Sequence, residues 1–363
     1  MKKLSVLLIF GGRSGEHEVS VNSATSIAAV INPQKYELIP LRIQKNGQWI
    51  LDKSILPGNK QKQPKRGEGR YLVPDPTIRH LFTKDGQPAE HLDIVFPIIH
   101  GSYGEDGCLQ GLLELAELPY VGSGVLGSAV GMDKVIQKQL LAYHDLPVTP
   151  FLSFNFHDWQ KDEQSMMKNI MKKFTFPHFI KPACLGSSVG ITKVHNEKEL
   201  NGAIELAFSY DAKIIVEKAI PNAREIECSV LGNAAPVASI LGEIVPSNEF
   251  YDYQAKYLDG KSQIIIPASL PQKISETLKK VALQTFLLLG ASGMARVDFL
   301  LRKDSNEFVI NEINTVPGFT AISMYPKLWE ASTLRYDVLI DTLLALAQEK
   351  SKEASRLKRE YKV

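Results

Sequence analysis

The stretch FVINEINTVPGFT, Phe308–Thr320, places a carboxylate and a carboxamide two residues apart at the end of an apolar run. Because side chains alternate between the two faces of a strand, Glu312 and Asn314 point the same way while Ile313 points opposite. Oxygen ligands without histidine or thiolate suit magnesium, which often shares its ligand shell with substrate phosphates. The stretch therefore suggests a hard cation that carries a phosphate.

The residues before this stretch predict the other arm of a β-hairpin. MARVDFLLRKDSNEFVINEIN, residues 294–314, reads as two strands joined by the turn KDSNE. Asp298 then converges with Glu312 and Asn314 on one face of the hairpin, and Arg296 lies on the same strand face as Asp298. The alternative, that these are polar positions on a solvated face, stays open on this pattern alone.

A glycine-rich loop offers a second piece of the same chemistry. KPACLGSSVG, residues 181–190, lies between two expected strands, so its N–H groups and hydroxyls can converge on phosphate oxygens while Lys181 neutralises their charge. It matches neither GxxxxGK[ST] nor GxGxxG, which disfavours a P-loop or a Rossmann site. An ordinary turn is the alternative. IIVEKAI, residues 214–220, reads as a strand that could offer its backbone to an adenine edge, or as a plain edge strand.

Length and composition set broad limits. With 363 residues, 44% apolar residues and 23% charged residues, the chain has the size and composition of a globular protein of two or three domains. A net charge of +2 gives no reason to expect a nucleic-acid or membrane partner. The three cysteines lack metal spacing and read as free thiols of a reducing compartment. The opening MKKLSVLLIF meets Gly-Gly too early for a signal peptide, so we expect a cytoplasmic protein.

The order of elements predicts an α/β protein. Residues 4–12 followed by residues 16–31 read as strand, glycine turn and helix, and DIVFPIIHG, residues 93–101, reads as another buried strand. One long helix is expected over residues 126–145, ahead of Pro147 and Pro150. We divide the chain into an N-terminal α/β substrate-binding domain over 1–134, a central lobe over 135–228 and a C-terminal lobe over 229–363.

Seven motifs, in the same order along nearly the whole chain, resemble the signatures of one family. The resemblance is to the ATP-grasp fold, and more closely to the D-alanine–D-alanine ligase family. It implies an N-terminal parallel α/β domain followed by two ATP-grasp lobes with the nucleotide between them. The motifs are GGRSGEHEVS, HGSYGEDGCLQG, GMDK, KPACLGSSVG, EFYDYQAKY, ARVDF and NEINTVPGFT.

The resemblance implies ATP-driven joining of two D-alanines through an acyl phosphate, for peptidoglycan precursor synthesis. Both chemical steps build or move negative charge, so the site needs metals, lysines and fixed donors. Two Mg²⁺ or Mn²⁺ ions would be held by Asp298, Glu312 and Asn314. Residues implied for ATP are Lys134, Lys181, Ser187, Ser188, Glu217, the backbone at Lys218 and Ile220, Glu225 and Lys256.

The resemblance also assigns the amino-acid substrates. Glu16 would bind the ammonium group of the first D-alanine, although by itself it reads as a charge at a helix start. Ser187 and Tyr257 would hydrogen-bond with Glu16 across a closed site. Substrate-binding and catalytic positions implied in this way are Glu16, Val19, His100, Ser187, Tyr257, Arg296, Gly318, Ser323 and Met324.

Several rival functions remain at this point. A relative that joins D-alanine to D-lactate is the nearest, although Tyr257 in the closing loop favours the amide product. Another ATP-grasp carboxylate–amine ligase would lack the paired motifs GGRSGEHEVS and HGSYGEDG, and a kinase would need a catalytic-loop aspartate signature. A non-catalytic nucleotide-binding protein would need a damaged metal set. The resemblance further implies a homodimer formed through the N-terminal region.

Overall fold

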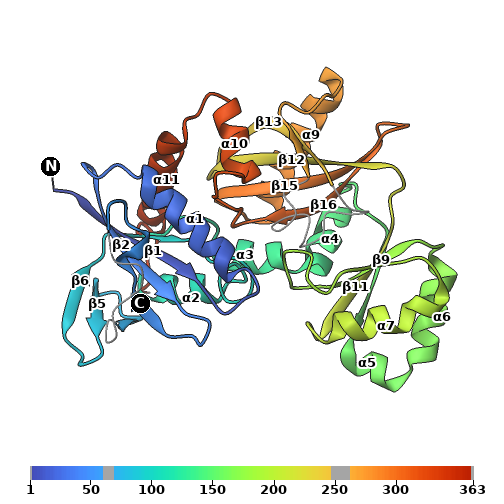
Figure 1. The fold of residues 1–363 in the computed structure, drawn as a ribbon, viewed down its shortest axis with the longest axis horizontal. Coiled ribbons are helices and arrows are strands. Elements are labelled where there is room, and N and C mark those ends of the chain that lie inside the picture. Colours follow the sequence, from blue (N-terminus) through green and yellow to red (C-terminus); the bar gives the residue numbers. More distant parts are fainter. Residues whose placement is uncertain (1, 60–68, 247–261, 361–363) are drawn as a thin grey trace.

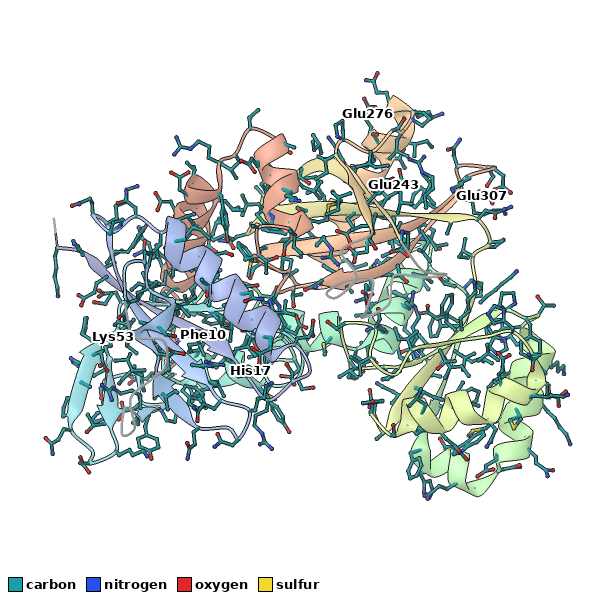
Figure 2. All side chains as sticks on the ribbon, in the orientation of Figure 1. Phe10, His17, Lys53, Glu243, Glu276 and Glu307 are labelled. Carbon is teal, nitrogen blue, oxygen red and sulfur yellow. The ribbon has the colours of Figure 1, made fainter. Side chains whose placement is uncertain are left out.

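The computed structural model describes residues 2–59, 69–246 and 262–360 of the 363-residue chain. Three sheet-containing lobes follow one another in the sequence, and helices pack around each (Figure 1). Apolar side chains such as Phe10 lie inside the lobes, whereas charged side chains such as Glu276 and Glu307 point outward (Figure 2). No helix of the described part of the chain is long and apolar enough to cross a membrane.

The N-terminal lobe is built on a mainly parallel sheet. Strand β1 (Leu4–Gly11) is buried from Ser5 onward, as its continuous apolar run predicts for a strand covered on both faces. It pairs in parallel with β2 (Tyr36–Ile43) and β7 (Ile94–Pro97), in the sheet order β3-β2-β1-β7. The lobe also contains α1 (His17–Val30), β3 (Trp49–Leu51), the 3-10 turn η1 (Lys53–Ile55) and a small sheet of β4 (Arg70–Leu72), β5 (His80–Thr83) and β6 (Pro88–His91).

The long helix expected over residues 126–145 is wrong. Two helices, α3 (Val125–Met132) and α4 (Lys134–Tyr143), meet at Asp133, whose backbone is extended (φ −84°, ψ 99°). The Asp133 carboxylate accepts hydrogen bonds from the N–H groups of Val135 and Ile136, so it caps a new helix. Helix α2 (Cys108–Leu115) precedes α3.

The central lobe carries an antiparallel sheet in the order β10-β9-β11-β8. The expected strand–loop–strand unit around the glycine-rich loop is confirmed, because β9 and β10 flank it and pair antiparallel. In Figure 1, helices α5, α6 and α7 lie on the side of this sheet that faces away from the other two lobes. The elements are β8 (Phe151–Asn155), α5 (Phe156–Lys161), α6 (Glu163–Lys173), β9 (His178–Pro182), β10 (Thr192–Val194), α7 (Glu197–Phe208) and β11 (Lys213–Lys218).

The C-terminal lobe contains the predicted hairpin. Strands β15 (Gly293–Arg302) and β16 (Phe308–Asn314) pair antiparallel and form one edge of a sheet ordered β14-β13-β12-β15-β16. The division of the chain at 134 and 228 stays a prediction, and β12 runs across residue 228. The remaining elements are β12 (Ala223–Gly232), β13 (Val237–Val245), β14 (Gln263–Ile265) and α9 (Gln272–Leu288).

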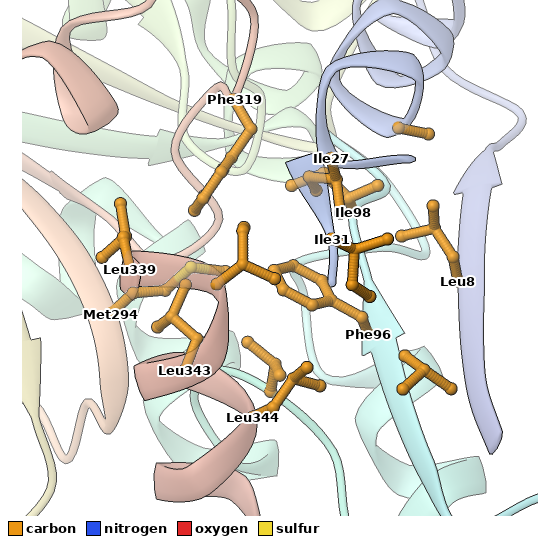
Figure 3. Close-up of a cluster of buried hydrophobic side chains, with 14 of the residues drawn as sticks. Leu8, Ile27, Ile31, Phe96, Ile98, Met294, Phe319, Leu339, Leu343 and Leu344 are labelled. Atoms are coloured by element: carbon orange, nitrogen blue, oxygen red, sulfur yellow. The ribbon is translucent and has the colours of Figure 1, made fainter. Parts of the chain in front are cut away.

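The last two helices join the first and last parts of the chain. Helices α10 (Met324–Ala331) and α11 (Tyr336–Ala354) follow the hairpin. Leu343 and Leu344 of α11 pack in one core with Leu8 and Phe96 of the N-terminal sheet (Figure 3). The N-terminal sheet therefore buries one face against helices that come from the far end of the sequence.

Candidate active site

Two adjoining cavities lie where the three lobes meet. One has a volume of about 530 Å³ and lies between the central sheet and the C-terminal sheet. The other has a volume of about 730 Å³ and lies between the N-terminal lobe and the C-terminal hairpin. Among the described residues, those that line both cavities are Lys134, Gly186, Ser187, Glu227, Arg296 and Glu312. Molecules bound in the two cavities would therefore meet at a shared wall that consists mainly of charged side chains.

The predicted site residues that the structure describes lie on the walls of the two cavities. Lys256 and Tyr257 fall outside the described residues. Nucleotide positions on the first cavity are Lys134, Lys181, Ser187, Ser188, Glu217, Lys218, Ile220 and Glu225. Amino-acid positions on the second cavity are Glu16, Val19, His100, Ser187, Arg296, Gly318, Ser323 and Met324. Metal positions lie on the first cavity (Asp298), on the second (Asn314) and on both (Glu312).

The register of the hairpin brings the predicted metal ligands together. Asp298 lies directly opposite Glu312, and Arg296 lies opposite Asn314. Residues opposed in an antiparallel pair have side chains close together on one face. A register shift begins immediately after Asp298, so the alternation that aligns these four residues ends there. The convergence that the sequence predicted is thus present in the strand pairing.

The donor atoms at this position fit a hard divalent cation. Two carboxylates and one amide supply only oxygen, the ligand type of magnesium. Among the described residues, no three His, Cys, Asp or Glu side chains form a group that could hold a metal, and this set contains only two carboxylates. Glu312 also lies 3.4 Å from Lys134 Nζ, and Asn314 Oδ1 accepts a hydrogen bond from the Val316 N–H at 3.0 Å.

Arg296 is held by two acidic side chains. Its Nε and Nη2 donate to the two oxygens of Asp298 at 2.7 Å each, and its Nε lies 3.1 Å from Glu227. Burial lowers the pKa of Arg296, but Asp298 and Glu227 outweigh it and raise that pKa well above its usual value. The predicted roles would require a metal ion to share Asp298 with Arg296, and a substrate carboxylate to compete for the guanidinium fork.

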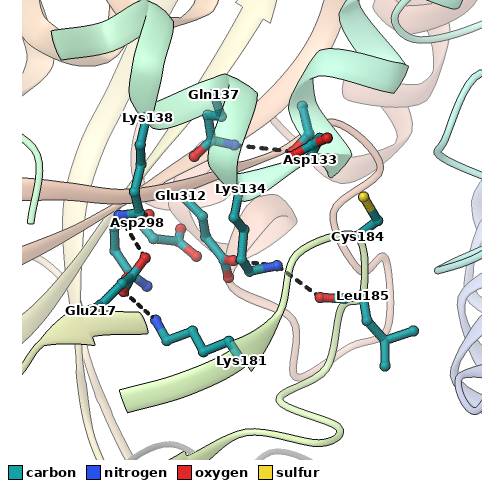
Figure 4. Close-up of polar contacts among 12 residues, drawn as sticks. Asp133, Lys134, Gln137, Lys138, Lys181, Cys184, Leu185, Glu217, Asp298 and Glu312 are labelled. Atoms are coloured by element: carbon teal, nitrogen blue, oxygen red, sulfur yellow. Dashed lines mark hydrogen bonds and ion pairs between the residues drawn. The ribbon is translucent and has the colours of Figure 1, made fainter. Parts of the chain in front are cut away.

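Two lysines share one buried carboxylate in the first cavity (Figure 4). Glu217 Oε2 lies 2.7 Å from Lys181 Nζ, and Oε1 lies 3.2 Å from Lys138 Nζ. Burial opposes ionisation of Glu217, but the two ammonium groups outweigh it and lower its pKa to about 2. Glu217 is therefore an anion at neutral pH and fixes the position of Lys181.

Sequence reasoning missed Lys138. It lies one helical turn after Lys134 on α4, is fully buried, and also donates to the backbone C=O of Asn311 at 2.9 Å. Lys134 donates to the C=O of Leu185 at 2.7 Å (Figure 4). The signal was available, because residues four apart on a helix lie on the same face. Both lysines thus point from α4 toward the boundary between the two sheets.

The backbone expected to meet an adenine edge is partly used within the sheet. The N–H of Lys218 donates to the C=O of Pro150 at 3.1 Å, and that of Ala219 donates to the C=O of Pro177 at 3.3 Å. An adenine at this edge would therefore not receive the Lys218 N–H without breaking the Pro150 contact. Ile220 and Glu225 remain on the cavity wall.

Glu16 lies under two glycines and one serine. Ser187 Oγ donates a hydrogen bond to Glu16, which is the contact predicted between the glycine-rich loop and the N-terminal lobe. A Cβ atom at Gly101 or Gly186 would come within 3.2 Å or 3.1 Å of Glu16 Oε2. These two glycines therefore leave space for the carboxylate, while Ser187 and Ser188 take left-handed backbone conformations (φ 52° and 58°).

His100 connects the N-terminal lobe to the turn after the hairpin. Its Nδ1 lies 2.9 Å from the C=O of Val316 and its Nε2 lies 3.3 Å from Ser23 Oγ. Ser23 Oγ in turn accepts a hydrogen bond from the Phe319 N–H at 3.2 Å. Burial lowers the pKa of His100. Gly318, the predicted second donor to substrate, therefore lies in a turn fixed by His100 and Ser23.

Glu105 is a second residue that sequence reasoning did not single out. It is buried and accepts a hydrogen bond from the Gly101 N–H at 2.8 Å. Burial, followed by the nearby charge of Glu16, raises the pKa of Glu105 well above its usual value. Its position inside the motif HGSYGEDG could have identified Glu105 from the sequence. Glu105 supports the loop that packs on Glu16.

A nucleotide-sized cavity between two antiparallel sheets, walled by lysines and carboxylates and open to a second cavity, defines an enzyme of the ATP-grasp class. Family models described as D-ala D-ala ligase N-terminus and D-ala D-ala ligase C-terminus match residues 5–123 and 140–345. The chain belongs to the D-alanine–D-alanine ligase family.

Individual relatives agree with this assignment. The chain is 46% identical to a D-alanine–D-alanine ligase of Natranaerobius thermophilus over 98% of both chains. The solved structure of the D-alanine–D-alanine ligase from Coxiella burnetii matches with a TM-score of 0.84 and 35% identity, over 98% of this chain and 97% of that one. A D-Ala:D-Ser ligase from Enterococcus faecalis matches with the same TM-score and identity, over 95% of this chain and 100% of that one.

Proposed function

We propose that this chain joins two D-alanine molecules in an ATP-dependent reaction, through an acyl phosphate of the first, and so supplies the dipeptide of peptidoglycan precursors. The observation that carries the proposal is the shared wall of the two cavities, where Lys134, Arg296 and Glu312 line both. A terminal phosphate reaching this wall from the first cavity would meet a carboxylate bound in the second. Such placement of two reactants is a major source of rate enhancement.

The first cavity would hold ATP. Lys134 and Lys181 carry positive charge toward the phosphates, and Glu217 with Lys138 keeps Lys181 in position. The hydroxyls and N–H groups of Ser187 and Ser188 would cover the phosphates, with Lys256 contributing from outside the described residues. Asp298, Glu312 and Asn314 would hold two magnesium or manganese ions, which supply positive charge to phosphate oxygens when bound.

The second cavity would hold the amino acids. Glu16 would bind the ammonium of the first D-alanine, next to Val19 and His100. Arg296 and the Gly318 N–H would bind the carboxylate of the second and stay close to the oxyanion that forms on the acyl carbon. Ser323 and Met324 line this cavity, and Met324 is almost fully buried.

The rival functions differ from the proposed one mainly in the acceptor, which is the second substrate of the reaction. A relative of known structure acts as a D-Ala:D-Ser ligase, and D-lactate is the other acceptor that the family resemblance raises. Purified protein incubated with ATP, Mg²⁺ and D-alanine, with D-serine or D-lactate added in turn across a range of pH, separates the three. We expect D-alanyl-D-alanine and one phosphate per dipeptide. Ester or D-Ala-D-Ser as the main product near neutral pH would overturn our choice.

One variant distinguishes a catalytic ligase from a protein that only binds a nucleotide. Glu312→Gln keeps the shape of the side chain but removes its charge, so we expect dipeptide formation to fall by about 10²-fold or more. Unchanged turnover would contradict the role of Glu312 and would favour a binding protein over a ligase.

Two further features belong to the proposal. We place the protein in the cytoplasm, where ATP is available, and its three cysteines are unpaired. A homodimer through the N-terminal region is supported by exposed leucines on adjoining helices, Leu115 of α2 and Leu126 of α3. Sedimentation of the purified protein at two concentrations checks the dimer, which a monomeric mass at both would exclude.

A further inference from the structure

A buried chain of polar contacts lies beneath the turn that carries Glu16. Asp52, which is fully buried, lies 3.3 Å from Nη1 of Arg42 in β2. Nη2 of Arg42 lies 3.0 Å from Nε2 of His17, and Nδ1 of His17 lies 2.7 Å from the C=O of Gly12. These contacts, from Asp52 through Arg42 and His17 to Gly12, are called the His17 relay below.

The chemistry of the relay fixes the state of His17. A guanidinium has only donors and stays protonated, so His17 Nε2 must accept the hydrogen bond from Arg42. His17 Nδ1 then carries the proton and donates it in a hydrogen bond to the Gly12 carbonyl. His17, which is 2% exposed, is thus held in one orientation by these two hydrogen bonds.

The relay acts on the short turn between β1 and α1. Gly11 and Gly12 have left-handed backbone conformations (φ 89° and 99°), and a Cβ atom on Gly11 would lie 3.0 Å from His17 Cε1. His17 begins α1 directly after Glu16, so the ring ties the first helical residue to the start of the turn (Figure 2). The backbone on both sides of Glu16 is therefore tied together by the hydrogen bond between His17 and Gly12.

A second contact holds the same turn from the cavity side. Ser14 Oγ donates to the C=O of His100 at 2.7 Å and accepts from the Glu16 N–H at 3.2 Å. Glu16 is therefore positioned from below by the relay and from the side by Ser14. The Nε of Arg42 is buried and has no hydrogen-bond partner among the described residues.

We propose that the His17 relay is a positioning device for the first amino-acid substrate: Arg42 and His17 set the turn that aims Glu16 at the substrate ammonium. This inference rests on the proposed role of Glu16 as the ligand of that ammonium. His17 and Arg42 do not line either cavity and act only through Glu16.

Substitutions of His17 by side chains of different length test the two hydrogen bonds of the relay one at a time. His17→Leu removes both hydrogen bonds, His17→Asn retains an N–H near the position of Nδ1, and His17→Gln retains an acceptor near the position of Nε2. Small misplacements of substrate ligands cost up to about 10²-fold in rate. We expect His17→Leu and His17→Gln to raise the KM for the first D-alanine about tenfold, and His17→Asn to stay within about threefold of the unaltered chain. The KM for ATP should stay unchanged in all three.

A control variant on the same helix distinguishes the positioning role of His17 from a purely structural role. Ile27 is fully buried on α1 and takes no part in the relay, so Ile27→Val loosens the packing of α1 without touching the turn. Its thermal midpoint should fall while both D-alanine KM values and the ATP KM stay the same. If Ile27→Val raised the first D-alanine KM as much as His17→Leu, the relay would be ordinary packing and the proposal would fail.

A double-variant cycle tests the route through Glu16. If the relay acts only by aiming this carboxylate, His17→Leu should add no further penalty in a Glu16→Gln background. Penalties that multiply would overturn the relay. If Glu16→Gln alone leaves the first D-alanine KM unchanged, the assigned role of Glu16 is wrong, and if the unaltered chain makes no dipeptide, the proposed function itself fails. The three failures are therefore distinguishable.

Discussion

At the scale of single residues, the carboxylate that two lysines share sets the charge of the first cavity. The family resemblance assigned Glu217 and Lys181 to ATP, and Lys181 also stands at the end of the strand before the glycine-rich loop. Lys138 was missed, because its spacing from Lys134 shows only that the two share a helix face, and a lysine in an amphipathic helix normally faces solvent. Only the docking of α4 onto β16 shows that this lysine is buried against the carbonyl of Asn311.

The stability contributed by Glu217 should depend on pH. Its pKa is lowered from 4.5 to about 2 in the folded chain, so its contribution is complete above about pH 4.5 and is lost as the pH falls toward 2. We expect Glu217→Gln to cost roughly 3–5 kcal/mol near pH 7, because it leaves two buried ammonium groups without their anion.

The measurement is urea unfolding of both chains between pH 7 and pH 3.5. The difference between them should shrink as the pH falls below about 4.5, because the unfolded form of the unaltered chain then takes up a proton at Glu217 while its folded form, with the lowered pKa, does not. A difference that stays constant over this range would show that Glu217 is not ionised by its lysines. Lys172→Gln, on the exposed end of α6, serves as a control and should change little.

At the scale of elements, the hairpin was predictable and the helix ahead of the central lobe was not. Alternating polarity between residues 294 and 314, with a polar turn in the middle, is enough to fix both strands and the face that Asp298 shares with Glu312. Helix α7 is capped by Asn196, whose side chain accepts a hydrogen bond from the Lys198 N–H.

The break at Asp133 escaped the pattern for a physical reason. Apolar spacing continues through residues 126–145, so periodicity alone indicates one helix. In the folded chain Lys213 forms an ion pair with Asp133, and the Lys134 N–H donates to the C=O of Ala183. These contacts come from the central lobe, far along the sequence, and turn α4 so that Lys134 reaches the cavities and Lys138 reaches Glu217.

Close packing of α3 makes one glycine sensitive to a single methyl group. A Cβ atom on Gly127 would lie 2.3 Å from the carbonyl oxygen of Gly290, which is backbone and cannot turn aside. We expect Gly127→Ala to destabilise the chain by about 1–3 kcal/mol. Gly202, on the exposed side of α7, has no neighbour within 4 Å of the same position.

Gly202→Ala is the matched comparison and should stabilise the chain by about 0.5–1 kcal/mol, because alanine favours helices and restricts the unfolded chain. Thermal unfolding of both variants checks the pair. If both variants shifted the midpoint equally, α3 would be able to move away from Gly290. The contact between Gly127 and Gly290 would then not fix the position of α3.

At the scale of the whole molecule, the main core does not follow the order of the chain. Its buried side chains come from β1, α1 and β7 at one end of the sequence and from α10 and α11 at the other (Figure 3). The sequence predicted an N-terminal unit over residues 1–134, because local patterns show where strands and helices lie but not which ones pack together. The apolar face of α11 could be seen in the sequence, but its partner could not.

Removal of α11 should therefore unfold the N-terminal sheet. A chain ending at residue 334 loses Leu339, Ile340, Leu343, Leu344 and Ala347 from the core, each buried to at least 97%. Their combined burial contributes about 6–13 kcal/mol, which is comparable with the usual 5–15 kcal/mol stability of a domain's folded state. We expect loss of cooperative melting in circular dichroism.

A chain ending at residue 355 is the control for this truncation. Of the described residues it lacks only the exposed residues 356–360, together with the surface ion pair between Arg359 and Glu117, which contributes little. Its midpoint should match that of the full chain. A cooperative transition in the shorter chain would show that the N-terminal lobe folds without α11.

The shared core has a consequence for the order in which this protein can fold as it is made. Strand β1 leaves the ribosome long before α11, which packs in the same core on its sheet as α1 does. Domains usually fold in the order of their synthesis. Here the apolar face of the sheet is covered only in part, by α1, until α10 and α11 have also been made, so the nascent N-terminal lobe is a natural substrate for chaperones that bind exposed hydrophobic surface.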